Sequence, residues 1–177
     1  MEIVYGNINK EEIKRSLFSG FERHQVVTKC LRREGDHWVV RDDPFIDQWD
    51  ENEYEFLVQC LIHTVEKGGV VIGAFEEGIL KGFVSVEADR LGTEGQYRDL
   101  TSLHVSEDRR GKGIGKTLFL KAAEWARQNG GKKLYLSSHS AIETQAFYAA
   151  MGCQDAKEYM EEHVMREPYD RQLEYEL

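Results

Sequence analysis

The sequence predicts a mixed α/β fold in which helices flank one central, mostly antiparallel sheet. Two apolar runs within residues 70–86, separated by Glu-Glu-Gly-Ile, predict a β-hairpin. Residues 98–137 predict a strand, a glycine-rich loop, an amphipathic helix and a second strand, which is the order of a crossover connection. The last residues, 173–177, alternate apolar and polar side chains and predict a strand at the end.

The N-terminal third contains three predicted elements. Residues 2–8 predict a first strand, and a helix-like region follows from Lys10, because its apolar residues share one face. Residues 51–67 place apolar side chains at the helical period, and two glycines then predict a stop. The stretch between, with Trp38 and Trp49, follows neither period, so no element is assigned to it.

The strand near residues 98–106 contains an irregularity. Leu103 and Val105 share one face, but Leu100 falls on the other face of a regular strand, so we expect a β-bulge between them. After the loop, a helix from Ile114 ends at a glycine pair, and a second helix over 142–151 ends at a glycine.

A basic, glycine-spaced loop, Arg-Arg-Gly-Lys-Gly-Ile-Gly-Lys over residues 109–116, precedes the helix from Ile114. Glycine lets the backbone approach a ligand closely, and a helix N-terminus offers unpaired N–H groups to an anion. Four cationic side chains surround the loop, which predicts a phosphate-binding site. The loop is not a nucleoside-triphosphate loop, because Arg110 stands where that motif needs its first glycine. It is not the dinucleotide fingerprint either, because that motif would need a glycine at position 116 or 118, where the chain has Lys116 and Leu118.

The segment Arg110–Gly115 does match the pattern Arg/Gln-x-x-Gly-x-Gly/Ala, and Leu-His-Val precedes it at 103–105. With the downstream segment 140–152, this resembles the GCN5-related N-acetyltransferases. The resemblance is clear over roughly residues 70–155. It implies a sheet of about six to seven strands splayed at the fourth strand, and acetyl-coenzyme A (acetyl-CoA) as cosubstrate. It also implies that the strand pairs with the pantetheine arm and the loop binds the pyrophosphate. The implied coenzyme-binding residues are Leu103, His104, Val105, Arg110, Gly111, Lys112, Gly113, Ile114, Gly115 and Lys116.

The resemblance also implies a catalytic pair. Tyr148 occupies the position of a tyrosine that lies near the coenzyme sulfur in many relatives and can donate a proton to the leaving thiolate; its ring also suits helix packing. Asp99 lies six residues before Val105, near the position where some relatives carry a carboxylate that acts as the general base. An aspartate there also suits a solvated turn. His104 is a further candidate for the base, although strand alternation points its side chain to the face opposite Leu103 and Val105.

Two features depart from the family pattern or leave alternatives open. Ala141 stands where an asparagine often contacts the coenzyme, so Ser138 or Ser140 either replaces that contact or caps the following helix. The acidic stretch from Asp42 to Glu55 either lines a site for a cationic amine or forms a solvated face.

Composition and charge limit the remaining possibilities. With 177 residues, 41% of them hydrophobic, the chain fits one domain over 1–177. No apolar run approaches the roughly 18 residues that span a bilayer, so no membrane partner is expected. A net charge of −9 disfavours a nucleic-acid surface. Three scattered cysteines without a signal-peptide pattern predict a cytoplasmic protein, and the histidine spacing predicts no metal site.

These expectations together predict a cytoplasmic N-acetyltransferase that passes an acetyl group from acetyl-CoA to a primary amine by direct attack. The expected acceptor is a small molecule. Two alternatives stay open at this point: a transferase for protein or peptide amines, and a sensor that binds acetyl-CoA without catalysis. A homodimer is plausible from the family habit.

Overall fold

The computed structural model describes residues 2–177 and contains a seven-stranded sheet in the order β1-β4-β5-β6-β7-β9-β8. Neighbouring strands are antiparallel, except that β6 and β7 are parallel. The predicted mixed, mostly antiparallel sheet is confirmed, with β6 as its fourth strand. The strands are β1 (Ile3–Asn7), β4 (Val70–Glu76), β5 (Ile79–Val86), β6 (Tyr97–Val105), β7 (Lys133–Ser138), β8 (Gln154–Asp155) and β9 (Arg171–Glu176).

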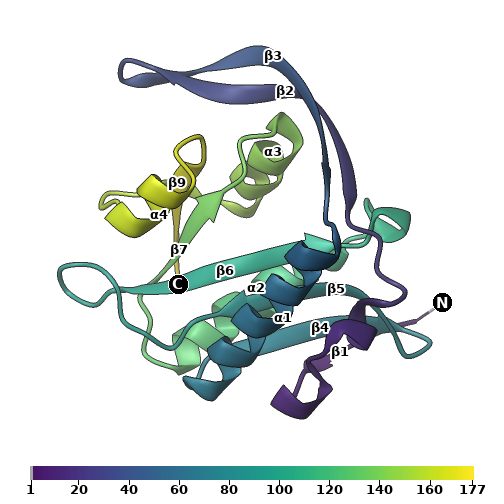
Figure 1. Cartoon of the computed structure of the whole chain (residues 1–177). Coiled ribbons are helices and arrows are strands. Elements are labelled where there is room, and N and C mark those ends of the chain that lie inside the picture. Colours follow the sequence, from purple (N-terminus) through teal and green to yellow (C-terminus); the bar gives the residue numbers. More distant parts are fainter. Residues whose placement is uncertain (1) are drawn as a thin grey trace.

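Helices cover both faces of this sheet (Figure 1). The helices are α1 (Glu51–Glu66), α2 (Ile114–Gln128), α3 (Ile142–Met151) and α4 (Glu161–Arg166). The helix-like region after β1 consists of two short 3-10 helices, Lys10–Glu12 and Arg15–Phe18, which pack with α1 on one face. Among the helices of residues 2–177, none has both the length and the apolar character that crossing a membrane requires.

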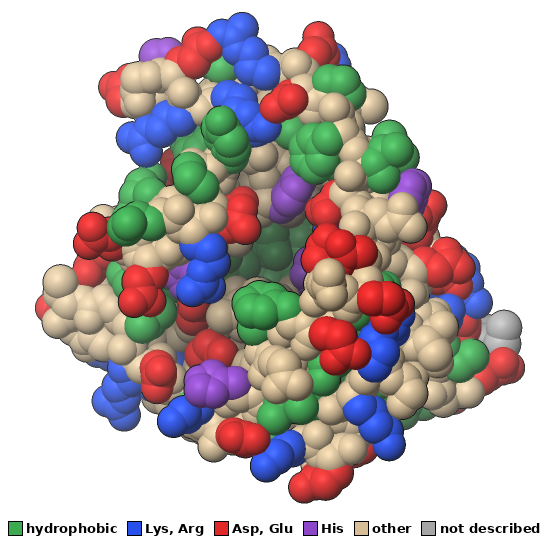
Figure 2. Space-filling view, in the orientation of Figure 1, with side chains coloured by type: hydrophobic (Ala, Val, Ile, Leu, Met, Phe, Trp, Pro, Cys, Tyr) green, Lys and Arg blue, Asp and Glu red, His purple; other side chains and the backbone are tan. Residues whose placement is uncertain are grey.

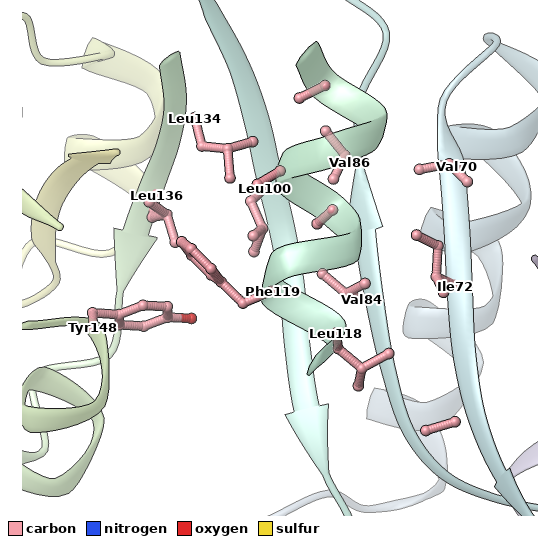
Figure 3. Packing of buried hydrophobic residues seen from close by; sticks show 14 of the residues in the cluster. Val70, Ile72, Val84, Val86, Leu100, Leu118, Phe119, Leu134, Leu136 and Tyr148 are labelled. Carbon is pink, nitrogen blue, oxygen red and sulfur yellow. The ribbon is translucent and has the colours of Figure 1, made fainter. Parts of the chain in front are cut away.

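Helix α2 packs on the opposite face and forms the larger core. Leu118, Phe119 and Ala122 are fully buried there, because the helical period places them on one side of α2. They contact apolar side chains of the central strands, as Figure 3 shows for Val84, Leu100 and others. This packing fixes the N-terminus of α2 beside the end of β6.

The predicted β-bulge is present in β6. Ser85 of β5 lies opposite Ser102, but the next residue, Val86, lies opposite Leu100, so Thr101 is the extra residue. On its other side, β6 pairs with β7 only over Tyr97–Asp99. Beyond Asp99 the two parallel strands separate, which confirms the predicted splay at the fourth strand.

A long β-hairpin occupies the stretch for which the sequence predicted no element. Strands β2 (His24–Glu34) and β3 (His37–Gln48) form a separate two-stranded sheet, called here the arm. Figure 1 shows the arm arching over α3. The Leu31 amide donates to the Ser140 carbonyl (2.8 Å), and the Arg32 guanidinium lies 4.8 Å from the Tyr169 ring centre. The arm therefore connects the start of the chain to its C-terminal part.

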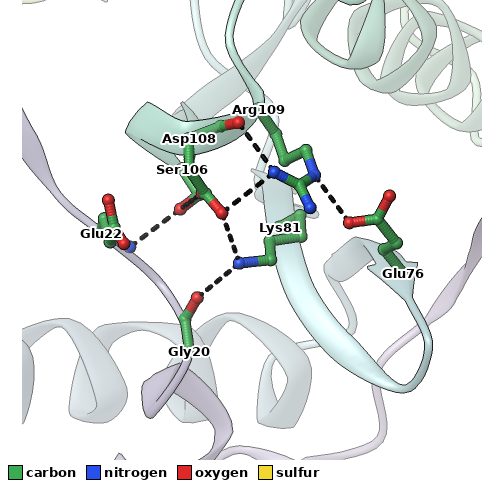
Figure 4. A network of polar contacts seen from close by, with 7 residues as sticks. All are labelled: Gly20, Glu22, Glu76, Lys81, Ser106, Asp108 and Arg109. Carbon is green, nitrogen blue, oxygen red and sulfur yellow. Dashed lines mark hydrogen bonds and ion pairs between the residues drawn. The ribbon is translucent and has the colours of Figure 1, made fainter.

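A polar network fixes the turn that leads into the glycine loop (Figure 4). The Lys81 ammonium of β5 donates to the Gly20 carbonyl (2.9 Å) and to Asp108 Oδ2 (2.8 Å). Ser106 Oγ donates to the other Asp108 oxygen (2.6 Å), and Arg109 Nε donates to Glu76 (2.6 Å). Burial raises the pKa of Asp108, but the hydrogen bonds from Lys81 and Ser106 outweigh it and keep that pKa below its usual value.

We expect the Lys81→Met substitution to lower the free energy of unfolding by about 2 kcal/mol, because it removes two charge-assisted hydrogen bonds from a buried lysine. Urea denaturation measures this change. The control is Lys10→Met, which breaks an exposed 3.1 Å ion pair with Glu66 and should cost less than about 0.5 kcal/mol. Equal losses in the two variants would contradict a role for the network in stability.

Candidate active site

A cleft of about 1320 Å³ opens where β6 and β7 separate. Figure 2 shows a hollow in the surface with histidine side chains in its wall. Of the predicted coenzyme-binding residues, all but the exposed Lys112 line this cleft, and so do Tyr148 and Asp99. The structure thus brings the end of β6, the glycine loop and α3 together around one space. The arm, through Phe45 and Asp47, and α4, through His163, complete the walls.

The end of β6 presents main-chain groups to this cleft. The Ser106 amide donates to the Lys81 carbonyl on the β5 side (2.8 Å), and successive residues of an antiparallel strand point their main-chain groups alternately to the two sides. The amide and carbonyl groups of Leu103 and Val105 therefore point to the side from which β7 has separated. Arg110 Nε donates to the Val105 carbonyl (3.3 Å). This edge can pair with an extended ligand.

The glycine loop leads directly into the N-terminus of α2. Gly111 (φ 75°) and Gly113 (φ 83°) adopt the left-handed conformation that glycine tolerates best, and a side chain at either would project into open space. Gly113 is the N-cap of α2, and no side chain caps the helix there. The first intrahelical bond runs from the Thr117 amide to the Gly113 carbonyl (3.1 Å), so the preceding amides are available to an anion.

Arg109 does not contribute its charge to the loop, which corrects the expectation of four cationic side chains there. Its guanidinium pairs with Glu76 (2.6 Å) and Asp108 (3.2 Å) within the network of Figure 4. Arg110 and Lys116 line the cleft and form no ion pair with any residue of the described chain, 2–177. A phosphate group at the loop would meet these two cations and the helix N-terminus together.

Tyr148 extends from α3 into the core side of the cleft. Its side chain is 7% exposed and packs against Phe119 and Phe147, with ring centres 6.3 Å and 5.2 Å away. Figure 3 shows its hydroxyl directed away from α3 toward α2. Within residues 2–177 this hydroxyl has no hydrogen-bond partner. Burial raises the pKa of Tyr148, so the phenol keeps its proton at neutral pH.

Asp99 lies at the point where β6 and β7 separate, and it is not a solvated turn residue. Its side chain is buried, and Oδ2 accepts a hydrogen bond from His163 Nε2 of α4 (2.6 Å). Its other oxygen, Oδ1, is buried without a partner among residues 2–177. The Tyr135 ring stacks on His163, with centres 5.6 Å apart and an interplanar angle of 22°. The carboxylate and the imidazole thus form one fixed pair.

Two other histidines line the cleft in different surroundings. His104 packs against Trp49 and Phe83, and burial lowers its pKa to about 3, so its imidazole is neutral at physiological pH. His139 accepts the Ala141 amide at Nδ1 (3.1 Å), and burial lowers its pKa as well. Only His163 has a raised pKa, and the hydrogen bond with Asp99 is the main cause.

Neither serine near Ala141 caps α3, which corrects that alternative. Ser138 Oγ donates to the Arg171 carbonyl (2.6 Å), and Ser140 Oγ accepts from Arg32 (2.7 Å). Ala141 itself occupies the N-cap and supplies no side-chain bond. Ser138 lines the cleft, whereas Ser140 joins α3 to the arm.

Three of the seven acidic residues from Asp42 to Glu55 have structural partners outside the cleft. Asp43 pairs with Arg32 (2.6 Å), Asp50 caps α1, and Glu51 pairs with Arg15 (2.8 Å). From this stretch, only Asp47 and Glu53 line the cleft, and Asp47 pairs with Arg23 (2.6 Å). The other carboxylates of the cleft are Asp99, Glu143, Glu167 and Asp170.

Sequence reasoning missed the residues that α4 and the following turn contribute. His163 and Asp170 both line the cleft, but α4 has only six residues, too few for a helical period to show. The arm had a usable signal, because Gly35-Asp36 separates two runs that contain β-branched residues. Among residues 2–177, no group of three His, Cys, Asp or Glu side chains is placed to hold a metal ion.

Comparison with solved structures relates this architecture to known proteins. A Bacillus anthracis protein described as a candidate streptothricin acetyltransferase, in complex with acetyl coenzyme A, has a TM-score of 0.72 at 14% identity, over 99% of this chain and 100% of its own. Nourseothricin acetyltransferase has a TM-score of 0.69 at 16% identity, over 98% and 96%. PaiA N-acetyltransferase from Thermoplasma acidophilum, in complex with coenzyme A, has a TM-score of 0.63 at 15% identity, over 100% of both chains.

At these identities the structures show a shared fold alone. No curated protein matches the chain by sequence. The model of the acetyltransferase (GNAT) family matches residues 30–153, which include β6, the glycine loop, α2 and α3. Because this match covers more than half of the chain and contains the loop and open strand edge described above, the chain belongs to the GNAT acetyltransferase family.

Proposed function

We propose that this protein is an N-acetyltransferase that transfers the acetyl group of acetyl-CoA to a small cationic amine by direct attack. The observation that carries the proposal is the meeting of two features in one cleft: the open main-chain edge of β6 and the uncapped N-terminus of α2. We propose that residues 1–177 act as one acetyltransferase domain. A cytoplasmic location and a homodimer stay predictions from the sequence.

The geometry fits acetyl-CoA in two places. The pyrophosphate would accept hydrogen bonds from the first amides of α2, with Arg110 and Lys116 supplying positive charge. The pantetheine arm would pair with the main chain of Leu103 and Val105, as an added strand pairs with a sheet edge. When bound, acetyl-CoA supplies a thioester whose carbonyl a main-chain amide near Val105 can polarise.

The other walls of the cleft favour a cationic acceptor. Four carboxylates, those of Glu53, Glu143, Glu167 and Asp170, line the cleft and form no ion pair within residues 2–177. Burial raises the pKa of Asp170 to about 6, so it is still mostly ionised at neutral pH. The cations of the glycine loop would attract a phosphate, and the unpaired carboxylates would attract a cationic amine.

The arm favours a small acceptor over a protein. Besides its bonds to Ser140, the arm reaches the C-terminal segment through Arg33, which donates to the Tyr159 hydroxyl (3.3 Å). Trp38 of the arm lies 5.4 Å from the Arg171 guanidinium. These contacts fasten the arm, which lines the cleft through Val26, Phe45 and Asp47, to the C-terminal segment. A cleft walled in this way admits a side chain or a small molecule more readily than a folded surface.

Direct attack needs no covalent intermediate on the enzyme. Burial raises the pKa of Cys153 to about 12, so its thiol is protonated at neutral pH and is a poor nucleophile. Tyr148 keeps its proton and directs an unpaired hydroxyl into the region between α3 and α2. There it can donate a hydrogen bond to the sulfur that leaves when the C–S bond breaks.

We expect Gly113→Glu to weaken acetyl-CoA binding by at least about 10²-fold, because a carboxylate would stand where the pyrophosphate binds. The matched control is Gly35→Glu, at a glycine with φ 65° and open surroundings in the arm turn, which should bind normally. Calorimetry measures binding, and thiol release over a panel of polyamines, aminoglycosides, amino acids and peptides measures turnover.

Wild-type turnover that Gly113→Glu abolishes and Gly35→Glu keeps would support the transferase and identify its acceptor class. Turnover with peptides alone would favour the protein-amine alternative. Tight binding without turnover on any amine would favour a sensor, and absence of coenzyme binding by the wild-type protein would overturn the whole proposal.

We expect Tyr148→Phe to lower kcat by about 10²-fold while the KM for acetyl-CoA stays within about twofold, because only the proton donor is lost. Steady-state kinetics on the best amine of the panel provides the measurement. Tyr5→Phe, at a partly buried tyrosine of β1 remote from the cleft, is the control. An unchanged kcat would mean that the Tyr148 ring serves packing alone.

A further inference from the structure

The amine that attacks the thioester must lose a proton, and the cleft offers three histidines to accept it. His104, with its pKa of about 3, is too weak a base at neutral pH. His139 already uses Nδ1 to accept the Ala141 amide, and its Nε2 faces Asp47 at 3.8 Å. His163 differs from both, because only one of its ring nitrogens has a partner within residues 2–177.

We propose that His163, oriented by Asp99, accepts the proton of the attacking amine. This inference rests on the acetyltransferase activity proposed above. His163 Nε2 donates to Asp99 Oδ2 over 2.6 Å, and no other side chain among residues 2–177 hydrogen-bonds that carboxylate. The bond fixes the proton on Nε2 and leaves the lone pair of Nδ1 as the acceptor. Asp99, itself buried, then acts through the imidazole as a positioning residue.

The surroundings of Tyr135 and Asp99 support this orientation of the imidazole. Tyr135 of β7 stacks on the ring, and its hydroxyl accepts the Met160 amide at the start of α4 (3.0 Å). Asp99 is the last β6 residue that pairs with β7, where it lies opposite Tyr135. The ring thus lies at the point where the cleft begins, between two paired strands and α4.

The protons of the step balance with the two substrates and solvent. The cationic amine first releases one proton to solvent, which frees the lone pair of its nitrogen. That nitrogen then forms a bond to the acetyl carbon, and its surplus proton passes to His163 Nδ1. The C–S bond then breaks, and the sulfur leaves with the electron pair and takes a proton from Tyr148. The tyrosine regains that proton from solvent, and His163 releases its own, so one proton has passed from nitrogen to sulfur overall.

The charges around His163 determine its response to pH. The hydrogen bond with Asp99 is the largest influence and raises the pKa of His163, against the effect of burial. Because the neutral ring is the active form, kcat should rise with pH through a value above the ordinary 6.5 and then level off. The titratable and charged groups that face this ring are Asp99 of β6, Tyr135 of β7, Glu162 and Arg166 of α4, and Asp170 before β9.

The test is the pH profile of kcat, with both substrates saturating, for the wild type, His163→Asn and His24→Asn. We expect His163→Asn to lower kcat by about 10²-fold and to lose the rising limb, with an unchanged KM for acetyl-CoA. His24→Asn is the matched control, because His24 also pairs with a carboxylate, Glu107 (2.7 Å), but lies outside the cleft. Asp99→Asn should shift the limb to lower pH, since the carboxylate no longer raises the pKa of His163.

A measurement on the resting protein separates this inference from the proposed function. NMR titration of the imidazole nitrogens should show the Nε2–H tautomer at His163 and a pKa above 6.5 that falls in Asp99→Asn. A His163→Asn variant that keeps the wild-type kcat and profile would overturn the role of His163 and leave the transferase intact. Absence of wild-type turnover on every amine, with the expected titration, would instead overturn the transferase proposal.

Discussion

The separation of β6 from β7 is the constraint on which the site depends. In a regular strand, Leu100 would point to the face opposite Leu103 and Val105, because successive side chains alternate. All three nevertheless pack in the α2 core. The extra residue, Thr101, resolves the conflict and turns His104 to the opposite face, beside Trp49. Main-chain groups left without a strand partner are costly when shielded from water. A ligand that pairs with them therefore stabilises the fold as it binds.

The cleft contains both unpaired cations and unpaired carboxylates, although the chain as a whole is acidic. The glycine loop keeps Arg110 and Lys116 unpaired, whereas Arg109 is held by Glu76 and Asp108 in the supporting network. The unpaired carboxylates of the cleft come from α1, α3 and the segment between α4 and β9. In a partly dehydrated cleft such charges act more strongly than they would on an open surface.

The sequence predicted the elements in which a side-chain pattern repeats over many residues or a specific motif is present. The strands from β4 to β7, helices α1, α2 and α3, and even the bulge at Thr101 follow from side-chain alternation and glycine positions. The sequence did not predict the arm, because its charged strands bury only a few residues, such as Val27 and Cys30. His163 could not be linked to Asp99, because 64 residues separate them and only the fold brings them together. Neither Ser138 nor Ser140 caps α3, because both hydroxyls hydrogen-bond residues of elements distant in the sequence.

The boundaries of the family match coincide with a division of labour along the chain. Residues 30–153 contain the strand edge, the loop and the tyrosine, which line the cleft together. Arg23 and, in the arm, Val26 precede this span, and His163 and Asp170 follow it, all lining the same cleft. Residues on both sides of the matched span thus complete the walls of one cleft. In the proposed transferase, substitutions in these flanking segments would change which acceptor fits the cleft while the proposed coenzyme-binding residues stay the same.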